Sequence, residues 1–516
     1  YDAIVVGAGQ NGLACAAYLA RAGLSVLVLE AYREIGGMTL TQELTLPGFW
    51  SDVHASGYQL ANLSPAPAEL DLAAHGLEPI APPAVYAHAY PDGRAVVVGR
   101  DLERAVGAVA ALAPADGPAF RAVLERYRAG RSAFVDAFFS PPGPAPAATD
   151  ERARFALQSV RAWANETFAS EAVRALFGGF AAFVGAAPDD AGGAEIAALF
   201  GAVLQQGGNN IVKGGMHGVA RALAGALAAA GGEIRVDAPV ARFVLAGGRA
   251  VGVRLEDGEE IPADRVVVSA TDPRQLVLRF LGEDVVGPAL AESMRRYEWG
   301  DAAMTIYLAL DGPVAYAAGP EVGGAAQVHL SGASLAALAQ PSLECRSGVL
   351  PAEPFVVAWN DGAIDPSRAP AGKTHMKLVV LGVPYAIAGD ATGRVAGRTW
   401  DAARDAYADH VIDLVTARYL PDLRARLLKR TAHSPVDLER TLRSAVRGTI
   451  SHGAMLPYQV GGWRPIPEFA GYRTPVDNVY LADSGTHPGP GVSMGSGRNA
   501  ARVICGDLGL AFPGAG

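Results

Sequence analysis

The feature that most constrains the fold is a glycine-rich turn close to the start of the chain. An apolar stretch, residues 3–6, leads directly into Gly7, Gly9 and Gly12, which have the spacing GxGxxG. A helix-like segment rich in Ala and Leu follows, and a second apolar stretch then ends on Glu30. Strand, glycine turn, helix, and a strand with a terminal acid form the pattern of a dinucleotide-binding βαβ unit. We therefore predict an α/β fold that begins with a Rossmann-like domain.

Each of these residues has a physical task in such a unit. Gly7 makes the tight turn, Gly9 lets the backbone approach a pyrophosphate, and Gly12 allows the helix to pack closely on the strand. The helix N-terminus offers free N–H groups and the positive end of its dipole to the phosphates. A carboxylate at Glu30 would bind ribose hydroxyls and repel a 2′-phosphate. The pattern thus predicts NAD or FAD as the ligand.

The residues after Glu30 favour FAD over NAD, because they resemble a known flavoprotein signature. Glu30 is followed by Gly36, Gly37 and Met38, and this unit resembles the FAD-binding signature of the glutathione-reductase-like flavoproteins. Residues 46–52, with Leu-Pro-Gly-Phe and a later aspartate, resemble the narrower phytoene-desaturase-like group. In amine oxidases and phytoene desaturases the second glycine pair lets the chain pass close to the FAD phosphates, so the resemblance implies FAD. The broader family often has arginine where this chain has Met38.

Two later segments extend the same resemblance. Residues 214–270 contain a GGM turn, an Ala/Leu helix, a PVARF strand and a VVVSA strand. The resemblance implies that the backbone at Val240 lies by the adenine; without it, Val240 is simply a core strand residue. Residues 475–503 contain a strand, the run GTHPGPGV and a helix. The resemblance implies that Asp483 to Gly485 face the ribityl and pyrophosphate groups. It also implies that the backbone N–H groups of Val492, Ser493 and Met494 meet the flavin pyrimidine edge. Donors at that edge stabilise the negative charge of a reduced flavin.

The signals divide the chain into two discontinuous domains. We expect a Rossmann-like FAD-binding domain over residues 1–75, 210–285 and 444–516. An α+β substrate domain is expected over residues 76–209 and 286–443, with helical spacing in its first part and strand-like runs in its second. A chain of 516 residues is long enough for one to three domains with a large core.

Composition argues against a nucleic-acid partner, a disulfide framework and a membrane-spanning helix. The chain has a formal net charge of −9 and no run of Lys or Arg, so nucleic acid is not an expected partner. Cys15, Cys345 and Cys505 are widely scattered, so we expect no disulfide framework, no metal site and a cytoplasmic location. No apolar run approaches the roughly 18 residues of a spanning helix. A homodimer stays open, and so does contact with the periphery of a membrane. Such contact would involve Phe138 and Phe139, although a place in the core or in a lid is the favoured interpretation of these two residues.

Candidate catalytic residues are few. His54 stands in a segment where relatives place a small residue beside the flavin, so it could act as a base, bind substrate or fill space. His487 lies within the C-terminal motif, which explains it better as cofactor support. Weaker candidates are Tyr58, His217, His452 and Trp463. Asp483 replaces a glycine that is usual in the desaturases. The chain has no HExxH pair and no clustered metal ligands, so the sequence offers no residues for a metalloenzyme function, and a hydrolase is not expected.

The expected activity is flavin-mediated dehydrogenation. Resemblance to the phytoene desaturases implies a lipophilic substrate in an apolar cavity between the domains, with a hydride leaving to flavin N5 and a proton to a base or water. Oxygen, a quinone or another carrier then receives the electrons. Three alternatives stay open: an amine oxidase with a polar amine pocket, a non-redox isomerase or hydratase, and a catalytically silent flavin-binding scaffold. Similarity of fold does not decide between them.

Overall fold

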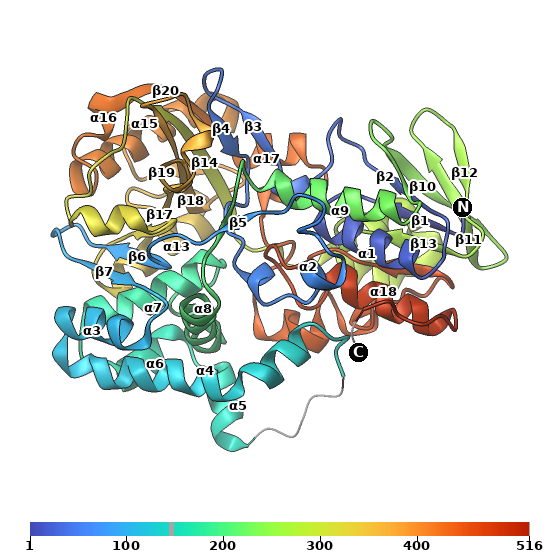
Figure 1. Ribbon diagram of the computed structural model, residues 1–516, viewed down its shortest axis with the longest axis horizontal. Helices are drawn as coiled ribbons and strands as arrows, with labels where there is room; N and C mark the ends of the chain where they lie inside the picture. Colours follow the sequence, from blue (N-terminus) through green and yellow to red (C-terminus); the bar gives the residue numbers. More distant parts are fainter. Residues whose placement is uncertain (144–148, 515–516) are drawn as a thin grey trace.

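The computed structural model describes residues 1–143 and 149–514. Its elements gather into two halves that lie side by side in Figure 1. The right half holds the N-terminal unit, and the left half holds a larger sheet with helices on both of its sides. The domains expected from the sequence also include residues 144–148 and 515–516, which lie outside the described residues. The mixed α/β fold class predicted from the sequence is confirmed.

A five-stranded parallel sheet forms the centre of the first half. The strand order is β21 (Val479–Leu481), β13 (Val266–Ser269), β1 (Ala3–Val6), β2 (Val26–Leu29) and β9 (Glu233–Arg235). Ala3 pairs with Val266 on one side and with Val26 on the other. The strands are nearly continuous apolar runs because both faces of the sheet are covered. The predicted buried strand at 266–268 is confirmed as a direct neighbour of β1.

Different elements cover the two faces of this sheet. One face packs on the helices α1 (Gln10–Arg21), α9 (His217–Ala229) and α18 (Gly495–Asp507). The other face packs on the antiparallel strands β10 (Val240–Ala246), β11 (Arg249–Leu255) and β12 (Glu260–Pro262). Val5 points to the helices and Ile4 to the strands, because neighbouring side chains alternate across a strand. Since α1 begins just after β1 ends, its N-terminus lies at the carboxyl edge of the sheet.

A seven-stranded mixed sheet forms the centre of the second half. Its order is β20 (Leu427–His433), β14 (Ala302–Leu310), β18 (Thr374–Val383), β17 (Phe355–Trp359), β15 (Gln327–Leu330), β6 (Tyr86–Ala89) and β7 (Ala95–Val98). β6 and β7 form the hairpin predicted around the turn at 91–94. One face of the sheet packs on α15 (Trp400–Arg418), and the opposite face packs on a layer of helices.

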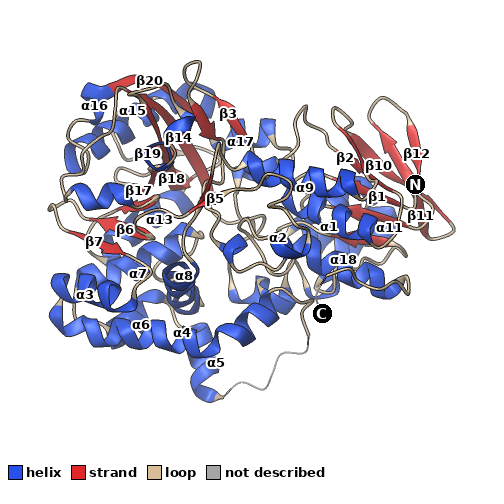
Figure 2. Ribbon diagram, in the orientation of Figure 1, coloured by secondary structure: helices blue, strands red, loops and turns tan. Residues whose placement is uncertain are grey.

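This helical layer lies below the larger sheet in Figure 2. It consists of α3 (Leu102–Leu112), α4 (Gly117–Phe138), α5 (Asp150–Leu157), α6 (Val160–Thr167), α7 (Glu171–Phe183) and α8 (Gly193–Gly207), with α13 (Leu335–Arg346) between it and the sheet edge. The break predicted near Pro114 and Gly117 separates α3 from α4. Of these helices, α4 reaches furthest toward the first half of the molecule.

Short elements connect these layers. The short strands are β3 (Thr41–Glu43), β4 (Trp50–Asp52), β5 (Pro79–Ile80), β8 (Ile211–Val212), β16 (Val349–Leu350) and β19 (Gly389–Asp390). The short helices are α2 (Ala66–Glu69), α10 (Pro273–Gln275), α11 (Glu283–Val286), α12 (Pro288–Arg295), α14 (Asp361–Ile364), α16 (Leu423–Arg426) and α17 (Pro435–Thr441). The pairs β3–β4, β5–β8 and β16–β19 each form a two-stranded sheet. The β5–β8 pair links a segment of the predicted substrate domain to one of the predicted FAD-binding domain.

The strands follow the expected division of the chain. Each strand of the five-stranded sheet lies in the segments expected to bind FAD, and each strand of the seven-stranded sheet lies in the segments expected to bind substrate. The exact domain boundaries stay a prediction. Within the described ranges, no helix is both long enough and apolar enough to cross a bilayer.

A buried ionic cluster joins the two halves. The Nη1 atom of Arg368 lies 3.1 Å from Asp52 Oδ2 and 2.8 Å from Asp361 Oδ2, and all three side chains are at most 1% exposed. Asp52 also accepts hydrogen bonds from the Thr41 hydroxyl at 2.6 Å and from the Met216 backbone N–H at 2.8 Å. One carboxylate at the end of β4 therefore connects the turn before α9 to the larger sheet.

Candidate active site

One cavity of about 530 Å³ extends between the two halves. Among the residues predicted to bind the cofactor, its lining includes Gly7, Gly9, Gly12, Glu30, Gly36, Gly37, Met38, Val240, Asp483 and Val492. Gly485, Ser493 and Met494 lie outside this lining. The cavity then continues between the larger sheet and the helical layer. Segments that are far apart in the sequence thus meet around one elongated space.

The glycine turn is built for a close approach to this space. Gly7 has a φ of +106°, which a residue with a Cβ rarely adopts. A Cβ on Gly12 would lie 2.0 Å from the carbonyl oxygen of Gly7, so the packing of α1 on β1 requires glycine there. A Cβ on Gly9 would meet no protein atom within 4 Å. Gly9 is therefore not required by the packing of the chain, and the open space above it fits the phosphates of a dinucleotide.

Glu30 is held at the end of β2 by backbone donors. Its two carboxylate oxygens accept hydrogen bonds of 2.8 Å from the N–H groups of Ala8 and Tyr32. Burial raises the pKa of Glu30 above its ordinary value, and these two N–H groups oppose that rise. A carboxylate has about four lone-pair sites, so Glu30 keeps acceptor capacity for ribose hydroxyls while its position is fixed.

The second glycine pair lies directly against the first turn. The Gly36 N–H donates to the carbonyl oxygen of Ala8 at 2.8 Å, and Gly36 forms a β-bridge with Gly9. Gly36 and Gly37 have φ values of +122° and +55°, so both adopt the left-handed half of conformational space. Met38 follows on the cavity wall and offers a thioether where an arginine would offer charged donors. This end of the cavity therefore offers backbone N–H groups and no cation at Met38.

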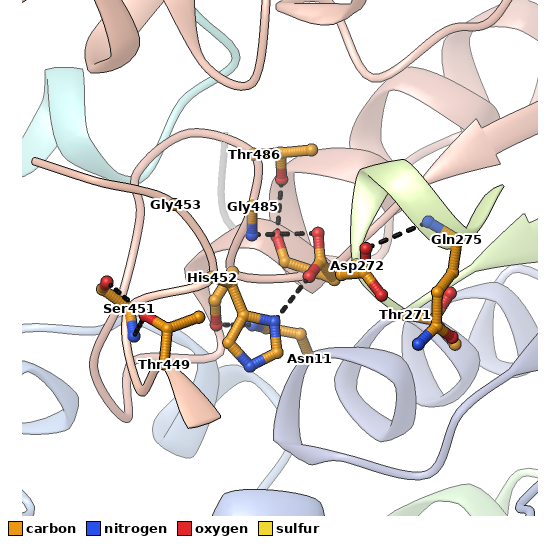
Figure 3. A network of polar contacts seen from close by, with 12 residues as sticks. Asn11, Thr271, Asp272, Gln275, Thr449, Ser451, His452, Gly453, Gly485 and Thr486 are labelled. Carbon is orange, nitrogen blue, oxygen red and sulfur yellow. Dashed lines mark hydrogen bonds and ion pairs between the residues drawn. The ribbon is translucent and has the colours of Figure 1, made fainter. Parts of the chain in front are cut away.

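A histidine–aspartate pair lies in the wall of the cavity, and Figure 3 shows its histidine, His452, within a network of polar contacts. His452 Nδ1 is 3.0 Å from Asp483 Oδ2, and both residues line the cavity. The other carboxylate oxygen of Asp483 accepts a 2.9 Å hydrogen bond from the Gly485 N–H. Arg464, which is fully buried, donates to the carbonyl oxygens of Ser451 and Ser484 and so ties the two loops together. Sequence reasoning ranked His452 low because nothing local links it to Asp483.

Asp272 is a buried carboxyl group next to this network (Figure 3). One of its oxygens accepts the Gln275 N–H at 3.0 Å as the N-cap of α10, and the other has no hydrogen-bond partner. Burial raises the pKa of Asp272 well above its ordinary value, and the nearby charge of Asp483 adds to the rise. The folded state thus holds a proton that the unfolded state loses, and stability falls as pH rises from about 4 toward the raised pKa.

We expect Asp272→Asn to stabilise the protein by about 1–2 kcal/mol at pH 8 and to have no such effect near pH 4. Asparagine keeps the N-cap hydrogen bond without requiring a buried proton. Chemical unfolding at several pH values measures the difference. Asp101→Asn, at the exposed N-cap of α3, is the matched control and should change stability by less than about 0.5 kcal/mol. An equal stability of Asp272→Asn and wild type at pH 8 would contradict this prediction.

The loop before α18 is organised by a side chain of α1. Gln10 accepts a 2.6 Å hydrogen bond from the Met494 N–H and donates a 3.1 Å hydrogen bond to the Gly491 carbonyl oxygen. The Ser493 hydroxyl accepts the N–H of Gly495 at 3.1 Å. The Met494 N–H, expected from the resemblance to meet the flavin, is therefore engaged by Gln10 in this structure. Only Val492 of that predicted trio lines the cavity.

The three predicted catalytic residues have different surroundings. His54 lines the cavity, and its Nε2 atom is buried without a hydrogen-bond partner. Burial, aided by the nearby His433 and Lys377, holds the pKa of His54 well below its ordinary value, so the ring is neutral at pH 7. Tyr58 is 2% exposed and lies outside the cavity lining. His487 also lies outside the lining, with Nε2 turned away toward α4.

The loop that carries His54 is anchored to the larger sheet. Lys377 of β18 donates to the carbonyl oxygens of Asp52 and His54, and the Tyr307 hydroxyl of β14 donates to the carbonyl oxygen of Val53. Lys377 is buried, and its burial lowers its pKa from the ordinary value to about 8. The larger sheet thereby fixes three successive carbonyl groups. This anchoring holds the His54 ring at the cavity.

The part of the cavity wall that lies between the larger sheet and the helical layer is mostly apolar. It comes from the helical layer and the larger sheet, and its members are Phe134, Phe138, Phe183, Ile196, Leu199, Phe200, Val203, Leu338, Phe355, Trp359, Val379 and Leu381. Several of these are aromatic, and the Phe183 and Phe200 rings stack with centroids 5.4 Å apart. An apolar wall of this kind favours a substrate that loses water-exposed apolar surface on binding.

Comparison with known proteins links the whole chain to one family. A family model described as flavin containing amine oxidoreductase matches residues 12–505. The mouse (Mus musculus) pyridine nucleotide-disulfide oxidoreductase domain-containing protein 2 is 30% identical over 98% of this chain and 94% of its own length. A component of the limonene dehydrogenase of Castellaniella defragrans is 28% identical over 99% and 95%, and hydroxyneurosporene desaturase of Cereibacter sphaeroides is 30% identical over 98% and 97%.

Solved structures share the fold across the full chain. An oxidoreductase from Methanosarcina mazei superposes with a TM-score of 0.63 at 17% identity, over 98% of this chain and 99% of its own. Putrescine oxidase with bound putrescine superposes with a TM-score of 0.62 at 15% identity, over 98% of each chain. At such low identity the similarity concerns the fold alone.

Proposed function

Because the chain belongs to the family of flavin-containing amine oxidoreductases, its cofactor is FAD, and we propose that it dehydrogenates a lipophilic substrate. The observation that carries the proposal is the single cavity: the dinucleotide turns line one part of it and an apolar, aromatic wall lines the rest. A cofactor and an apolar substrate could therefore lie next to each other inside it. The names limonene dehydrogenase and hydroxyneurosporene desaturase, which both denote removal of hydrogen from a lipophilic molecule, support the substrate class.

In this proposal the first half holds FAD mainly through backbone groups. Gly9, Gly36 and Gly37 accommodate the pyrophosphate and Glu30 binds the ribose. Asp483, whose position is fixed by His452, would face the ribityl and pyrophosphate groups. Gly7 and Gly12 shape the turn, Met38 and Val240 contribute wall contacts, and Gly485, Val492, Ser493 and Met494 build the loop at the ring end. Each of these roles is a proposal.

The chemistry needs little from the protein besides orientation and one proton acceptor. When bound, the flavin accepts a hydride at N5. The apolar wall orients the substrate bond and excludes water. His54 is neutral and has a buried, unpartnered Nε2 at the cavity. We therefore assign to it the role of accepting the proton that leaves with the hydride, or of holding a polar group of the substrate. Tyr58 lies outside the cavity lining and has no assigned contact with the substrate.

Partners and location belong to the proposal as well. A cytoplasmic location is part of the proposal. The electron acceptor stays open between oxygen, a quinone and another carrier, and contact with the periphery of a membrane and a homodimer stay open as well. The predicted acidic character of the chain, with a formal net charge of −9, argues against nucleic acid as a partner.

The test is an anaerobic titration of the yellow holoenzyme. We expect lipophilic alkenes or terpenes to bleach the flavin absorbance and simple amines to leave it unchanged. Bleaching by amines alone would replace this proposal with amine oxidation. Product formation without net bleaching or oxidant consumption would indicate the non-redox isomerase or hydratase, and no reduction by any member of either class would indicate a silent flavin-binding scaffold.

Replacing His54 with alanine is expected to slow flavin reduction by the substrate about 100-fold, because general base catalysis commonly contributes 10²–10⁴-fold. The bound FAD should stay stoichiometric, since His54 lies in a wall and not in the glycine turns. Stopped-flow reduction measures the rate, and His75→Ala, at a residue outside the cavity lining, is the control. An unchanged rate in His54→Ala would remove His54 from the mechanism.

A further inference from the structure

The C-terminal end of α4 lies against the segment that forms the cofactor loop, although the two are more than 300 residues apart. His487 Nε2 is 2.9 Å from the carbonyl oxygen of Ala137. Arg498 Nη1 donates to the carbonyl oxygen of Phe139 at 2.8 Å, and Asn499 Nδ2 donates to that of Ser140 at 3.2 Å. Asn499 Nδ2 also donates to the carbonyl oxygen of Phe138 at 3.5 Å. Three side chains from residues 487–499 thus converge on the four consecutive residues 137–140 at one helix end.

These contacts satisfy a specific need of a helix. The last carbonyl groups of a helix have no partner within it, and the same end carries the negative pole of the helix dipole. A carbonyl oxygen can only accept, so His487 must carry its proton on Nε2. Burial lowers the pKa of His487, which keeps this ring neutral. Arg498 adds a positive charge that is itself held by a bidentate contact with Glu69, at 2.7 Å for each oxygen.

The helix end that is held in this way also forms a wall of the cavity. Phe134 and Phe138 both line the cavity, and their spacing places them on one face of α4, where their ring centroids are 5.3 Å apart. The Phe138 ring also lies 6.2 Å from the His487 ring. Phe134, Phe138 and the Ala137 carbonyl group therefore belong to the last turn and a half of α4, and Phe139 and Ser140 directly follow the helix.

The capping residues in turn extend from the cofactor end. Thr486, next to His487, donates through its hydroxyl to the carbonyl oxygen of Asp483 at 2.8 Å. Pro488, on its other side, lines the cavity. Arg498 and Asn499 lie on α18, whose N-terminal residue Gly495 follows the loop at 491–494. Residues 483–499 thus contact the part of the cavity assigned to the cofactor. The same segment binds the C-terminal end of α4, which forms a wall of the apolar part.

From this juxtaposition we propose that His487, Arg498 and Asn499 are positioning residues that cap α4 and fix Phe134 and Phe138 as a wall of the substrate site. His487, first considered as a catalytic candidate, acts through α4 and touches neither substrate nor cofactor. These three residues couple the shape of the apolar part of the cavity, and hence the choice of substrate, to the loop that surrounds the cofactor. The inference takes this cavity as the substrate site, as proposed above, but its test requires no turnover.

The test compares three variants of the FAD-bound protein. His487→Ala removes the hydrogen bond to Ala137. His487→Gln places an amide N–H near the position of Nε2 and should restore it. His410→Ala removes a bond of the same kind, from His410 Nε2 to the carbonyl oxygen of Ala352 at 2.7 Å on α15, away from the cavity lining.

Amide hydrogen exchange of residues 134–140 is the first measurement. We expect exchange about fivefold faster in His487→Ala, as loss of one hydrogen bond implies, with wild-type rates there in His487→Gln and His410→Ala. The second measurement is the binding of Nile red, an uncharged apolar dye, which should be about three- to fivefold weaker in His487→Ala only, because the wall is no longer preorganised.

Equal exchange over residues 134–140 in His487→Ala and wild type would overturn the proposal. So would an acceleration that His487→Gln does not reverse, or one that His410→Ala reproduces. Should His487→Ala fail to fold, Asn499→Ala provides the second variant and should show the same local acceleration. A protein that reduces its flavin with no lipophilic substrate would refute the proposed function and leave this exchange result intact, so the two failures are distinguishable.

Discussion

Replacing Gly9 with alanine is expected to weaken FAD binding at least about 100-fold while the protein still folds. A Cβ at Gly9 would meet no protein atom within 4 Å, and the residue does not require a positive φ. The added methyl group therefore has no cost within the chain. It points into the space that the pyrophosphate needs, and loss of about 3 kcal/mol of contacts there corresponds to about 100-fold in affinity.

The ratio of flavin to protein absorbance after purification measures the effect, together with the melting temperature of each variant. Gly107→Ala, in the exposed interior of α3 where a Cβ also meets nothing, is the matched control and should keep full FAD content. Gly12→Ala should fail differently, by unfolding, because its Cβ would lie 2.0 Å from the Gly7 carbonyl oxygen. Stoichiometric, tightly bound FAD in Gly9→Ala would show that the cofactor does not approach this turn.

Replacing Arg368 with methionine is expected to destabilise the protein by about 3–5 kcal/mol. Arg368 neutralises Asp52 and Asp361, and each of the three side chains is at most 1% exposed. Removing one partner of such a group leaves buried charges without compensation. Asp52 also accepts hydrogen bonds from the Thr41 hydroxyl and the Met216 N–H. The substitution should therefore also weaken the contact between the two halves and lower the fraction of protein that retains FAD.

Chemical denaturation followed by flavin release and by circular dichroism measures this loss. The control is Arg235→Met, which breaks an exposed pair with Glu259 at 2.6 Å, where the side chains are 42% and 46% exposed. Exposed pairs contribute little, so a loss below about 1 kcal/mol is expected there. A similarly small loss in Arg368→Met would mean that the buried cluster does not stabilise the junction.

The dinucleotide unit was predictable because its constraints are local. Gly7, Gly9, Gly12 and Glu30 lie within one strand–turn–helix–strand segment, and each is required by backbone geometry or by a ligand that follows the backbone. The hairpin at 91–94 and the helix break near Pro114 were predictable for the same reason, since turn and breaker residues act on their immediate neighbours.

Long-range pairs were not predictable in this way. Asp483 and His452, 3.0 Å apart in the structure, are separated by 31 positions, and neither local segment indicates that the two side chains pair. Nothing in the sequence distinguishes Arg368 from the surface residue that an arginine usually is. His487 was noticed for its motif but its partner, a carbonyl oxygen of α4, lies 350 positions away. No local signal contains that information.

The amino-acid sequence by itself determined the elements of this protein, the class of its cofactor and the segments that surround it, because hydrophobic period, glycine placement and turn chemistry are properties of neighbouring residues. Only the tertiary structure showed that the cavity lined by the glycine turns continues into an apolar part, that His54 lines this cavity with an unpartnered Nε2 atom, and that His487 Nε2 lies 2.9 Å from a carbonyl oxygen of a distant helix. These features arise from packing between segments hundreds of residues apart, and the free energy that selects among such packings is summed over the whole core rather than recorded at any single position.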